Sequence, residues 1–143
     1  MLVLCLSLSG CTLGERWNLT KVEDFSEDQM WITAVIGQQC SVLGVNPLTG
    51  FTDDEYIVAG SLYGETGKHY TAAMWALAGK NMIMVWNPIL DGRYTDEQLI
   101  SAAQHECCHI KLGHRQATAE AEEEAVQCEK EFFGSSIEMM EEK

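Results

Sequence analysis

Two histidines and one glutamate in the stretch 105-HECCHIKLGH-114 have the types and the spacing that suit a metal site. His105 and His109 are four residues apart, so on an α-helix both imidazoles lie on one face, one turn apart, and can reach one ion. Glu106 follows the first histidine directly, which places it beside the ion, where it can take a proton from a metal-bound water. We therefore expect a zinc site with His105 and His109 as ligands and Glu106 as the general base.

The elements predicted around this stretch are those that such a site needs. Thr95 followed by Gln98 is a capping-box pattern, which predicts a helix over 96–112. The apolar run 82–86 predicts a strand directly before that helix, and a helix rich in carboxylates is expected over about 117–133. The five-residue histidine pattern also recurs by chance, but a strand, a histidine helix and an acidic helix in this order favour the zinc site.

The rest of the chain predicts a small α+β fold. Ser26 followed by Gln29 resembles a capping box, so we expect a helix over 27–38, and the turn-rich residues 44–54 are expected to form a loop. The middle of the chain predicts a β-meander of three strands, at 56–62, 69–78 and 82–86. The expected architecture is a small antiparallel or mixed sheet of about three strands, packed against an N-terminal helix, the histidine helix and the acidic helix.

Composition limits the classes of function. With 143 residues, 46% hydrophobic and 22% charged, the chain is expected to form one globular domain. Nine Lys and Arg against 22 Asp and Glu give a net charge of −13, which argues against nucleic acid as a partner. No apolar run reaches the roughly 18 residues that a membrane-spanning helix needs.

The first residues, MLVLCLSLSGC, resemble a bacterial lipoprotein signal that ends in a lipobox, Leu8-Ser9-Gly10-Cys11. The resemblance implies that Cys11 carries lipid and that the protein is anchored in the bacterial cell envelope, facing the periplasm or the exterior. The alternative is an ordinary buried N-terminal strand. The expected division of the chain is a signal segment at 1–11, a linker at 12–24, the domain at 25–134 and an acidic tail at 135–143.

HECCHIKLGH followed by 122-EEEAV-126 resembles the gluzincin class of zinc metallopeptidases, in particular the membrane-associated CAAX-protease type and its small bacterial lipoprotein relatives. The resemblance covers roughly residues 82–134. It implies a minimal zincin-like fold, a Zn²⁺ cofactor and hydrolysis of a peptide or protein substrate. Aligned on Ala125, it makes Glu122 the third zinc ligand, with Glu123 as the closest competitor. Val126 stands where the family has an aspartate that supports the ligand histidines.

Two further residues are candidates for stabilising charge in the transition state or for supporting the ligands. His114 corresponds to a histidine that the family often carries five residues after the motif, and Tyr94 lies just ahead of the histidine helix. The alternative for His114 is a solvated residue beyond the end of the helix. For Tyr94 the alternative, an ordinary loop residue, is favoured.

The adjacent cysteines face different directions on the predicted helix. Cys107 lies about 200° around the helix from His105 and faces the core, whereas Cys108 lies only about 60° away and flanks the metal face. Cys107 is therefore expected to be a small buried apolar side chain. If the helix that carries Glu122 packs beside this one, a disulfide from Cys107 or Cys108 to Cys128 is expected as a clamp. A structural metal site that uses the cysteines is the alternative, although adjacent cysteines lack the usual C-x-x-C spacing.

These features favour a zinc-dependent metallopeptidase, with strand 82–86 as the sheet edge along which an extended peptide substrate lies. The expected partners are a peptide or protein substrate and a membrane, contacted through lipid on Cys11 and not through a spanning helix. The alternative is a non-catalytic lipoprotein that uses the same fold to bind zinc or another protein.

Overall fold

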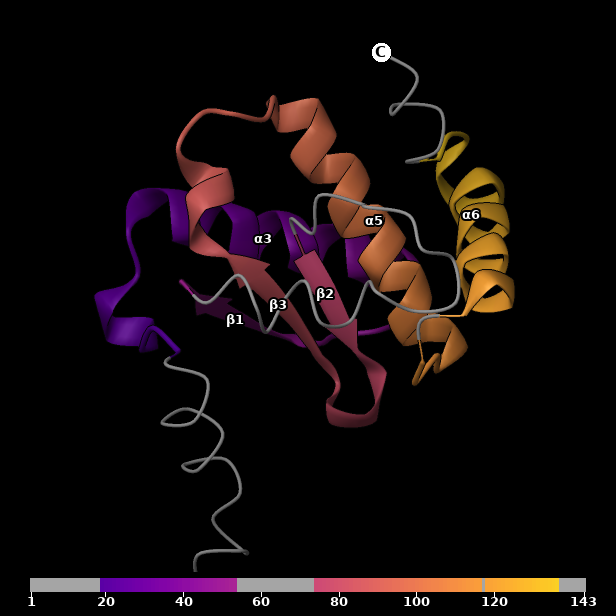
Figure 1. The fold of residues 1–143 in the computed structure, drawn as a ribbon. Coiled ribbons are helices and arrows are strands. Elements are labelled where there is room, and N and C mark those ends of the chain that lie inside the picture. The colour runs from indigo at the N-terminus through magenta and orange to yellow at the C-terminus, as the bar shows by residue number, and fades with distance from the viewer. Residues whose placement is uncertain (1–18, 54–73, 117, 137–143) are drawn as a thin grey trace, which may run out of the picture.

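The structure, a computed structural model, describes residues 19–53, 74–116 and 118–136. This part of the chain contains three α-helices and a three-stranded mixed sheet, so the predicted α+β class is confirmed (Figure 1). The predicted signal segment with Cys11 and the predicted strand 56–62 lie outside the described residues. The elements, in chain order, are α3 (Glu27–Val42), β1 (Leu48–Thr52), β2 (Met74–Leu77), β3 (Met82–Trp86), α5 (Asp96–Leu112) and α6 (Ala119–Phe133).

Both predicted capping boxes are present and begin the two longer helices. Ser26 Oγ accepts a hydrogen bond from Gln29 N at 3.2 Å, and Thr95 Oγ1 accepts one from Gln98 N at 3.1 Å. The glutamine side chains bond back to the cap backbone in both cases. Gly113 ends α5 in the left-handed conformation, with φ of 69°. None of the helices in this part of the chain is both long and apolar enough to cross a membrane.

The sheet differs from the predicted meander because residues 44–54 are not all loop. Leu48–Thr52 forms β1, which pairs in parallel with β3, while β2 pairs with β3 in antiparallel fashion. Gly50 and the preceding Pro47 suggest a turn locally, but Phe51 and Thr52 are fully buried and their pairing with β3 decides the conformation. The prediction of a loop was therefore wrong at this strand.

β3 is the central strand of the sheet, in the order β1-β3-β2. The prediction that Met82–Trp86 forms a free sheet edge for a peptide was wrong, because β1 and β2 occupy both of its sides. The backbone groups of β3 are used in pairing within the sheet, which leaves this strand unsuited to adding a substrate strand.

Residues 19–24, expected to belong to a linker, contribute to the fold. Thr20 N donates a hydrogen bond to Phe51 O at 3.1 Å, on β1. A short 3-10 turn follows at Val22–Asp24 and leads into the N-cap of α3. The domain therefore includes residues before 25.

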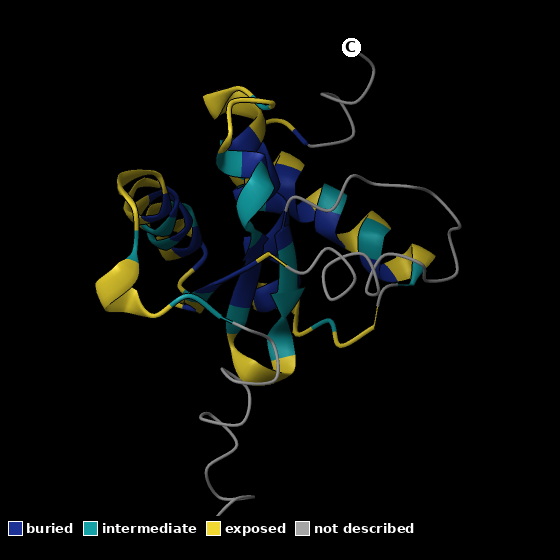
Figure 2. Cartoon of the chain, turned by 60° about the vertical axis from the view of Figure 1, so that its left-hand side comes forward, coloured by how far each residue is buried: buried dark blue, intermediate teal, exposed yellow. Residues whose placement is uncertain are grey.

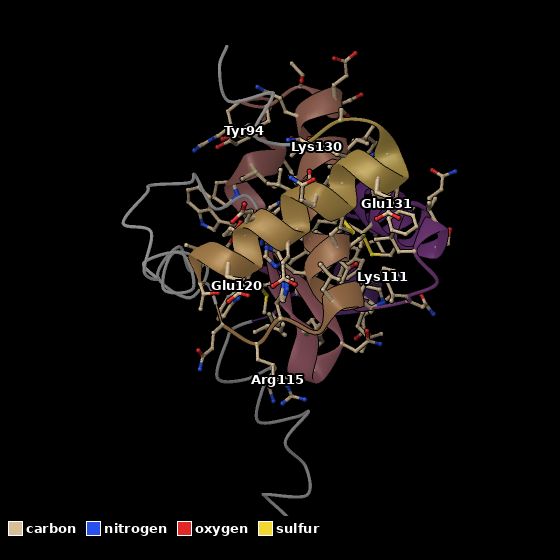
Figure 3. All side chains as sticks on the ribbon, turned by 90° about the vertical axis from the view of Figure 1, so that its right-hand side faces the viewer. Tyr94, Lys111, Arg115, Glu120, Lys130 and Glu131 are labelled. Carbon is tan, nitrogen blue, oxygen red and sulfur yellow. A yellow bond between two sulfur atoms is a disulfide. The ribbon has the colours of Figure 1, made fainter. Side chains whose placement is uncertain are left out.

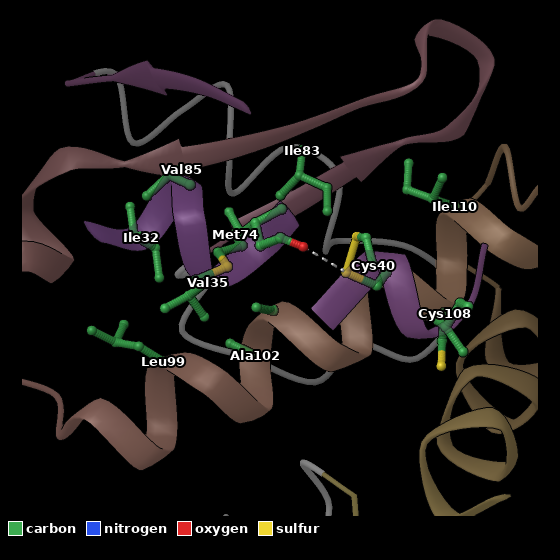
Figure 4. Close-up of a cluster of buried hydrophobic side chains, with 14 of the residues drawn as sticks. Ile32, Val35, Cys40, Met74, Ile83, Val85, Leu99, Ala102, Cys108 and Ile110 are labelled. Atoms are coloured by element: carbon green, nitrogen blue, oxygen red, sulfur yellow. Dashed lines mark hydrogen bonds between the residues drawn. A yellow bond between two sulfur atoms is a disulfide. The ribbon is translucent and has the colours of Figure 1, made fainter. Parts of the chain in front are cut away.

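The core lies between the sheet and the helices α3 and α5 (Figures 2 and 4). Ile83 and Val85 of β3 belong to this core and are fully buried. Apolar side chains of both helices complete it, including Ile32, Val35, Ile36, Leu99 and Ala103. Burial of these side chains, each contributing roughly 1.5–3 kcal/mol when large, fixes α5 against the sheet.

Two disulfides join α5 to its neighbouring helices. Cys40 of α3 bonds to Cys107, and Cys128 of α6 bonds to Cys108, with Cα–Cα distances of 5.1 and 5.9 Å. The second pair is one of the two that the sequence left open. The expectation that Cys107 is a free apolar side chain was wrong. Cys107 does face the core, but there it meets Cys40 of α3 and forms a disulfide.

Removing the Cys40–Cys107 disulfide by substituting both residues with Ala should lower the free energy of unfolding by about 4 kcal/mol, since the cross-link closes a long span of chain. The matched control is Cys108→Ala with Cys128→Ala, which opens a shorter span and should cost about 3 kcal/mol. Denaturant unfolding without reductant measures both, and hydrogen exchange should show faster opening of α6 only in the control. An unchanged unfolding midpoint in the first variant contradicts the expectation.

Candidate metal centre

Helix α5 brings the two predicted histidine ligands together. His105 and His109 are both buried, and their Nε2 atoms lie 3.1 Å apart. Their rings are nearly perpendicular, at 86°, with centroids 4.7 Å apart. This arrangement follows from the four-residue spacing, which places the two side chains one turn apart on the same face.

Helix α6 packs beside α5 and places Glu122 against both histidines. Glu122 Oε2 lies 2.8 Å from His105 Nε2, and Glu122 Oε1 lies 3.0 Å from His109 Nε2. The neighbouring Glu123, which was the competing candidate for third ligand, is exposed on the outer side of the helix. The structure therefore brings Glu122, and not Glu123, to the histidines.

Three ligand atoms, one each from His105, His109 and Glu122, converge within 4.8 Å of one another. Their contacts of 2.8–3.1 Å approach the separation of about 3.3 Å that ligand atoms have around a tetrahedral Zn²⁺ ion with bonds of about 2.0–2.1 Å. Two imidazole nitrogens and one carboxylate are also the ligand set of many catalytic zinc sites. The residues thus fit a small divalent cation.

Glu106 lies beside the two histidines on α5 and contacts the sheet. Its Oε1 accepts a hydrogen bond from Ala76 N of β2 at 3.0 Å, and the side chain is buried. Burial raises the pKa of Glu106, although the nearby His109 and His105 partly oppose the shift. A carboxylate with a raised pKa, held beside the two histidines by a backbone amide, is suited to accept a proton.

Glu129 is a member of the site that sequence analysis missed. Its Oε2 lies 2.6 Å from His105 Nδ1, and the side chain is fully buried. Glu129 comes seven residues after Glu122, so two helical turns bring both carboxylates to the same face of α6. Glu129 lies one helical turn beyond Val126, and Val126 is the position at which the family that the sequence resembles has an aspartate. Glu129 is thus placed to support His105 from a neighbouring position on α6. The seven-residue spacing was the signal that could have identified it.

The charges in this group stabilise one another. Burial alone would lower the pKa of His105, but its contacts with Glu122 and Glu129 outweigh burial and raise that pKa well above its usual value of 6.5. Burial likewise disfavours ionised Glu122, yet its hydrogen bonds to His105 and His109 hold its pKa well below the usual range. Without a metal, the proton held by His105 balances part of the carboxylate charge, and a bound cation would displace this proton.

The structure separates the two remaining candidates. His114 Nδ1 lies 2.9 Å from His109 Nδ1, so His114 contacts a predicted ligand. Tyr94 precedes α5, and His105 is nine residues into that helix, about 14 Å along its axis. Figure 3 shows Tyr94 well away from Glu120, which marks the first turn of α6. Tyr94 instead packs against the core and lines a surface hollow with Trp31, which fits the alternative of an ordinary loop residue and not a role at the site.

Replacing Glu129 with Gln should weaken Zn²⁺ binding about 10–100-fold, because His105 loses the charged group that orients its ring. Glu131→Gln is the matched control, since Glu131 is exposed on the same helix. Competition with a chromophoric chelator measures both affinities, and thermal unfolding of the metal-free proteins checks that both fold. Equal affinities for the two variants would show that Glu129 does not support the site.

Zn²⁺ affinity should fall as pH decreases, beginning above the ordinary histidine pKa of 6.5. The ion needs neutral His105, whereas the raised pKa keeps that imidazole protonated until the pH rises through it. Titration calorimetry between about pH 6 and pH 9, in buffers of different ionisation enthalpy, measures the affinity and the protons released. A constant affinity without proton release across this range would rule out the expected competition.

Known proteins provide no assignment for the candidate metal centre. Comparisons with protein-family models, with curated proteins and with solved structures find no match to this chain. The residues available for an assignment are those that meet around α5, namely His105, Glu106, His109, Glu122 and Glu129.

Proposed function

We propose that this protein is a zinc metallopeptidase, with His105, His109 and Glu122 as the zinc ligands. The observation that carries the proposal is the convergence of His105 Nε2, His109 Nε2 and the carboxylate of Glu122. His105 Nε2 lies 2.8 Å from Glu122 Oε2 and 3.1 Å from His109 Nε2, and His109 Nε2 lies 3.0 Å from Glu122 Oε1, beside the buried carboxylate of Glu106. Bound Zn²⁺ would supply a Lewis acid that polarises a carbonyl and acidifies a water molecule. Three protein ligands are the number that catalytic zinc sites use.

Glu106 has the properties that the proton transfers of peptide hydrolysis require. Burial makes its carboxylate more basic than in water, and the amide of Ala76 fixes its position. In the proposed reaction Glu106 takes the proton of the attacking water and then gives it to the leaving amine. Because Glu106 has passed its proton to the amine by the end of each cycle, the same carboxylate serves first as base and then as acid.

The cysteines support export of the protein, which is part of the proposal. Two disulfides join the described helices, and disulfides persist mainly in oxidising compartments. A lipid anchor at Cys11 in the bacterial cell envelope agrees with this chemistry, although Cys11 itself lies outside the described residues. A non-catalytic lipoprotein that binds zinc or another protein through the same site is the alternative.

Glu106→Gln should retain Zn²⁺ and lose cleavage of casein or a peptide library by about 10²–10⁴-fold, because it keeps the ligands and removes the base. Zinc content by atomic absorption and initial cleavage rates measure the two effects. Glu123→Gln, which changes an exposed glutamate next to a ligand, is the control and should leave both unchanged.

Each outcome separates the two functions. Cleavage by the wild-type protein that disappears in Glu106→Gln supports the peptidase. Zinc binding without cleavage by the wild-type protein supports the non-catalytic alternative. Equal turnover by the wild-type protein and Glu106→Gln, or the absence of bound zinc, contradicts the proposal.

A further inference from the structure

His114 lies directly behind His109, where the end of α5 turns back on itself. Gly113, with φ of 69°, reverses the chain, and His114 N donates a hydrogen bond to His109 O at 3.1 Å. The turn places His114 Nδ1 at 2.9 Å from His109 Nδ1. The position of the His114 ring is thus set by the backbone at the end of the helix.

The contact is on the side of His109 away from the other ligands. His109 Nε2 faces His105 and Glu122, whereas its Nδ1 faces His114. The two nitrogens of an imidazole point in divergent directions, so a group hydrogen-bonded to Nδ1 does not also coordinate an ion bound at Nε2. His114 is therefore not placed as a fourth ligand, nor at the point where a substrate carbonyl would meet the ion.

The identity of the atoms fixes where the protons lie. Two ring nitrogens form a hydrogen bond only when one carries hydrogen and the other a lone pair. If His109 Nε2 binds zinc, as the proposed function requires, its hydrogen must be on Nδ1, and His114 Nδ1 must accept it. The hydrogen of neutral His114 then lies on Nε2.

This assignment gives a role to an otherwise unsatisfied atom. His114 Nε2 is buried and has no hydrogen-bond partner among the described residues, but Glu124 Oε2 lies 3.7 Å away. This distance is too long for a hydrogen bond and still allows electrostatic attraction to an N–H directed at it. The half-exposed carboxylate of Glu124 thus favours the tautomer that His109 needs.

We propose that His114 is a positioning residue, which accepts a hydrogen bond from His109 and holds its ring toward the ion, as Glu129 does for His105. This inference rests on the proposed zinc site and adds the source of support for its second ligand. A neutral imidazole suits this place because Glu106, Glu122 and Glu129 already bring three carboxylates to the site. A fourth buried carboxylate would add repulsion, whereas His114 accepts the hydrogen bond without charge.

The test compares His114→Asn with His114→Leu. Asn Oδ1 occupies nearly the place of His Nδ1 and can accept the hydrogen bond, whereas Leu fills similar space without an acceptor. In chelator competition, His114→Leu should bind Zn²⁺ about 10–100-fold more weakly than the wild-type protein, and His114→Asn within a few-fold of it. Arg115→Leu, at the adjacent exposed position, is the control and should leave the affinity unchanged.

A spectroscopic measurement separates positioning from general damage to the fold. In ¹⁵N NMR spectra of the zinc-loaded wild-type protein, the His109 Nδ1–H should be protected from exchange and coupled across the hydrogen bond to His114 Nδ1. Absence of this signal overturns the inference even if His114→Leu fails to fold. Equal zinc affinity in the wild-type protein and His114→Leu, or an equal loss in His114→Asn and His114→Leu, also overturns it.

These outcomes are distinct from failure of the proposed function. A wild-type protein that binds no zinc overturns both. Zinc binding with the expected difference between the His114 variants, but without peptide cleavage, supports the positioning role and contradicts the peptidase.

Discussion

The site depends on the burial of one stretch of α5 from every direction. Six consecutive residues, 105–110, are buried, although a helix on a protein surface normally keeps one face in water. They are buried because α3, α6 and β2 contact this stretch from different sides. Each neighbour meets a different side chain: Cys107 meets α3, Glu106 meets β2, and His105 meets α6. A rotation of α5 about its axis would break all these contacts together.

The attachment of α6 is of a different kind from that of α3. Large apolar side chains join α3 to the core, whereas the buried residues of α6 are Ala121, Ala125, Cys128 and Glu129. Two alanines bury little apolar area, so the disulfide to Cys108 and the contacts of Glu122 and Glu129 with histidines have a large share in holding α6. Buried charges are costly unless paired, and here the pairs join the two helices. The helix that carries Glu122 is thus held partly by its contacts with the histidines.

Local signals in the sequence predicted the parts of the fold that local interactions determine. Both capping boxes and the end of α5 at Gly113 depend on neighbouring residues only, and they were predicted correctly. The pairing of β1 with β3 joins residues more than 30 positions apart, which no local pattern reveals, so Leu48–Thr52 was mistaken for loop. At the site, helical periodicity predicted the approach of His105 to His109. The approach of Glu129 to His105 and of Cys40 to Cys107 depends on how separate helices pack, and was missed.

The adjacent cysteines of α5 also have a consequence for oxidative folding. The four cysteines in the described part of the chain can pair in three ways, and one wrong arrangement exchanges only the partners of Cys107 and Cys108. Neighbouring residues on a helix differ by about 100° in direction, so that exchange would demand a comparable rotation of α5 and would turn the histidines away from Glu122. Isomerisation between the two arrangements begins when an external thiolate opens one disulfide and forms a mixed disulfide. The released cysteine thiolate then attacks the other disulfide, and the external thiol leaves when the last pair closes. The favourable contacts of the correctly oriented helix can therefore select the native disulfides, which then preserve that orientation.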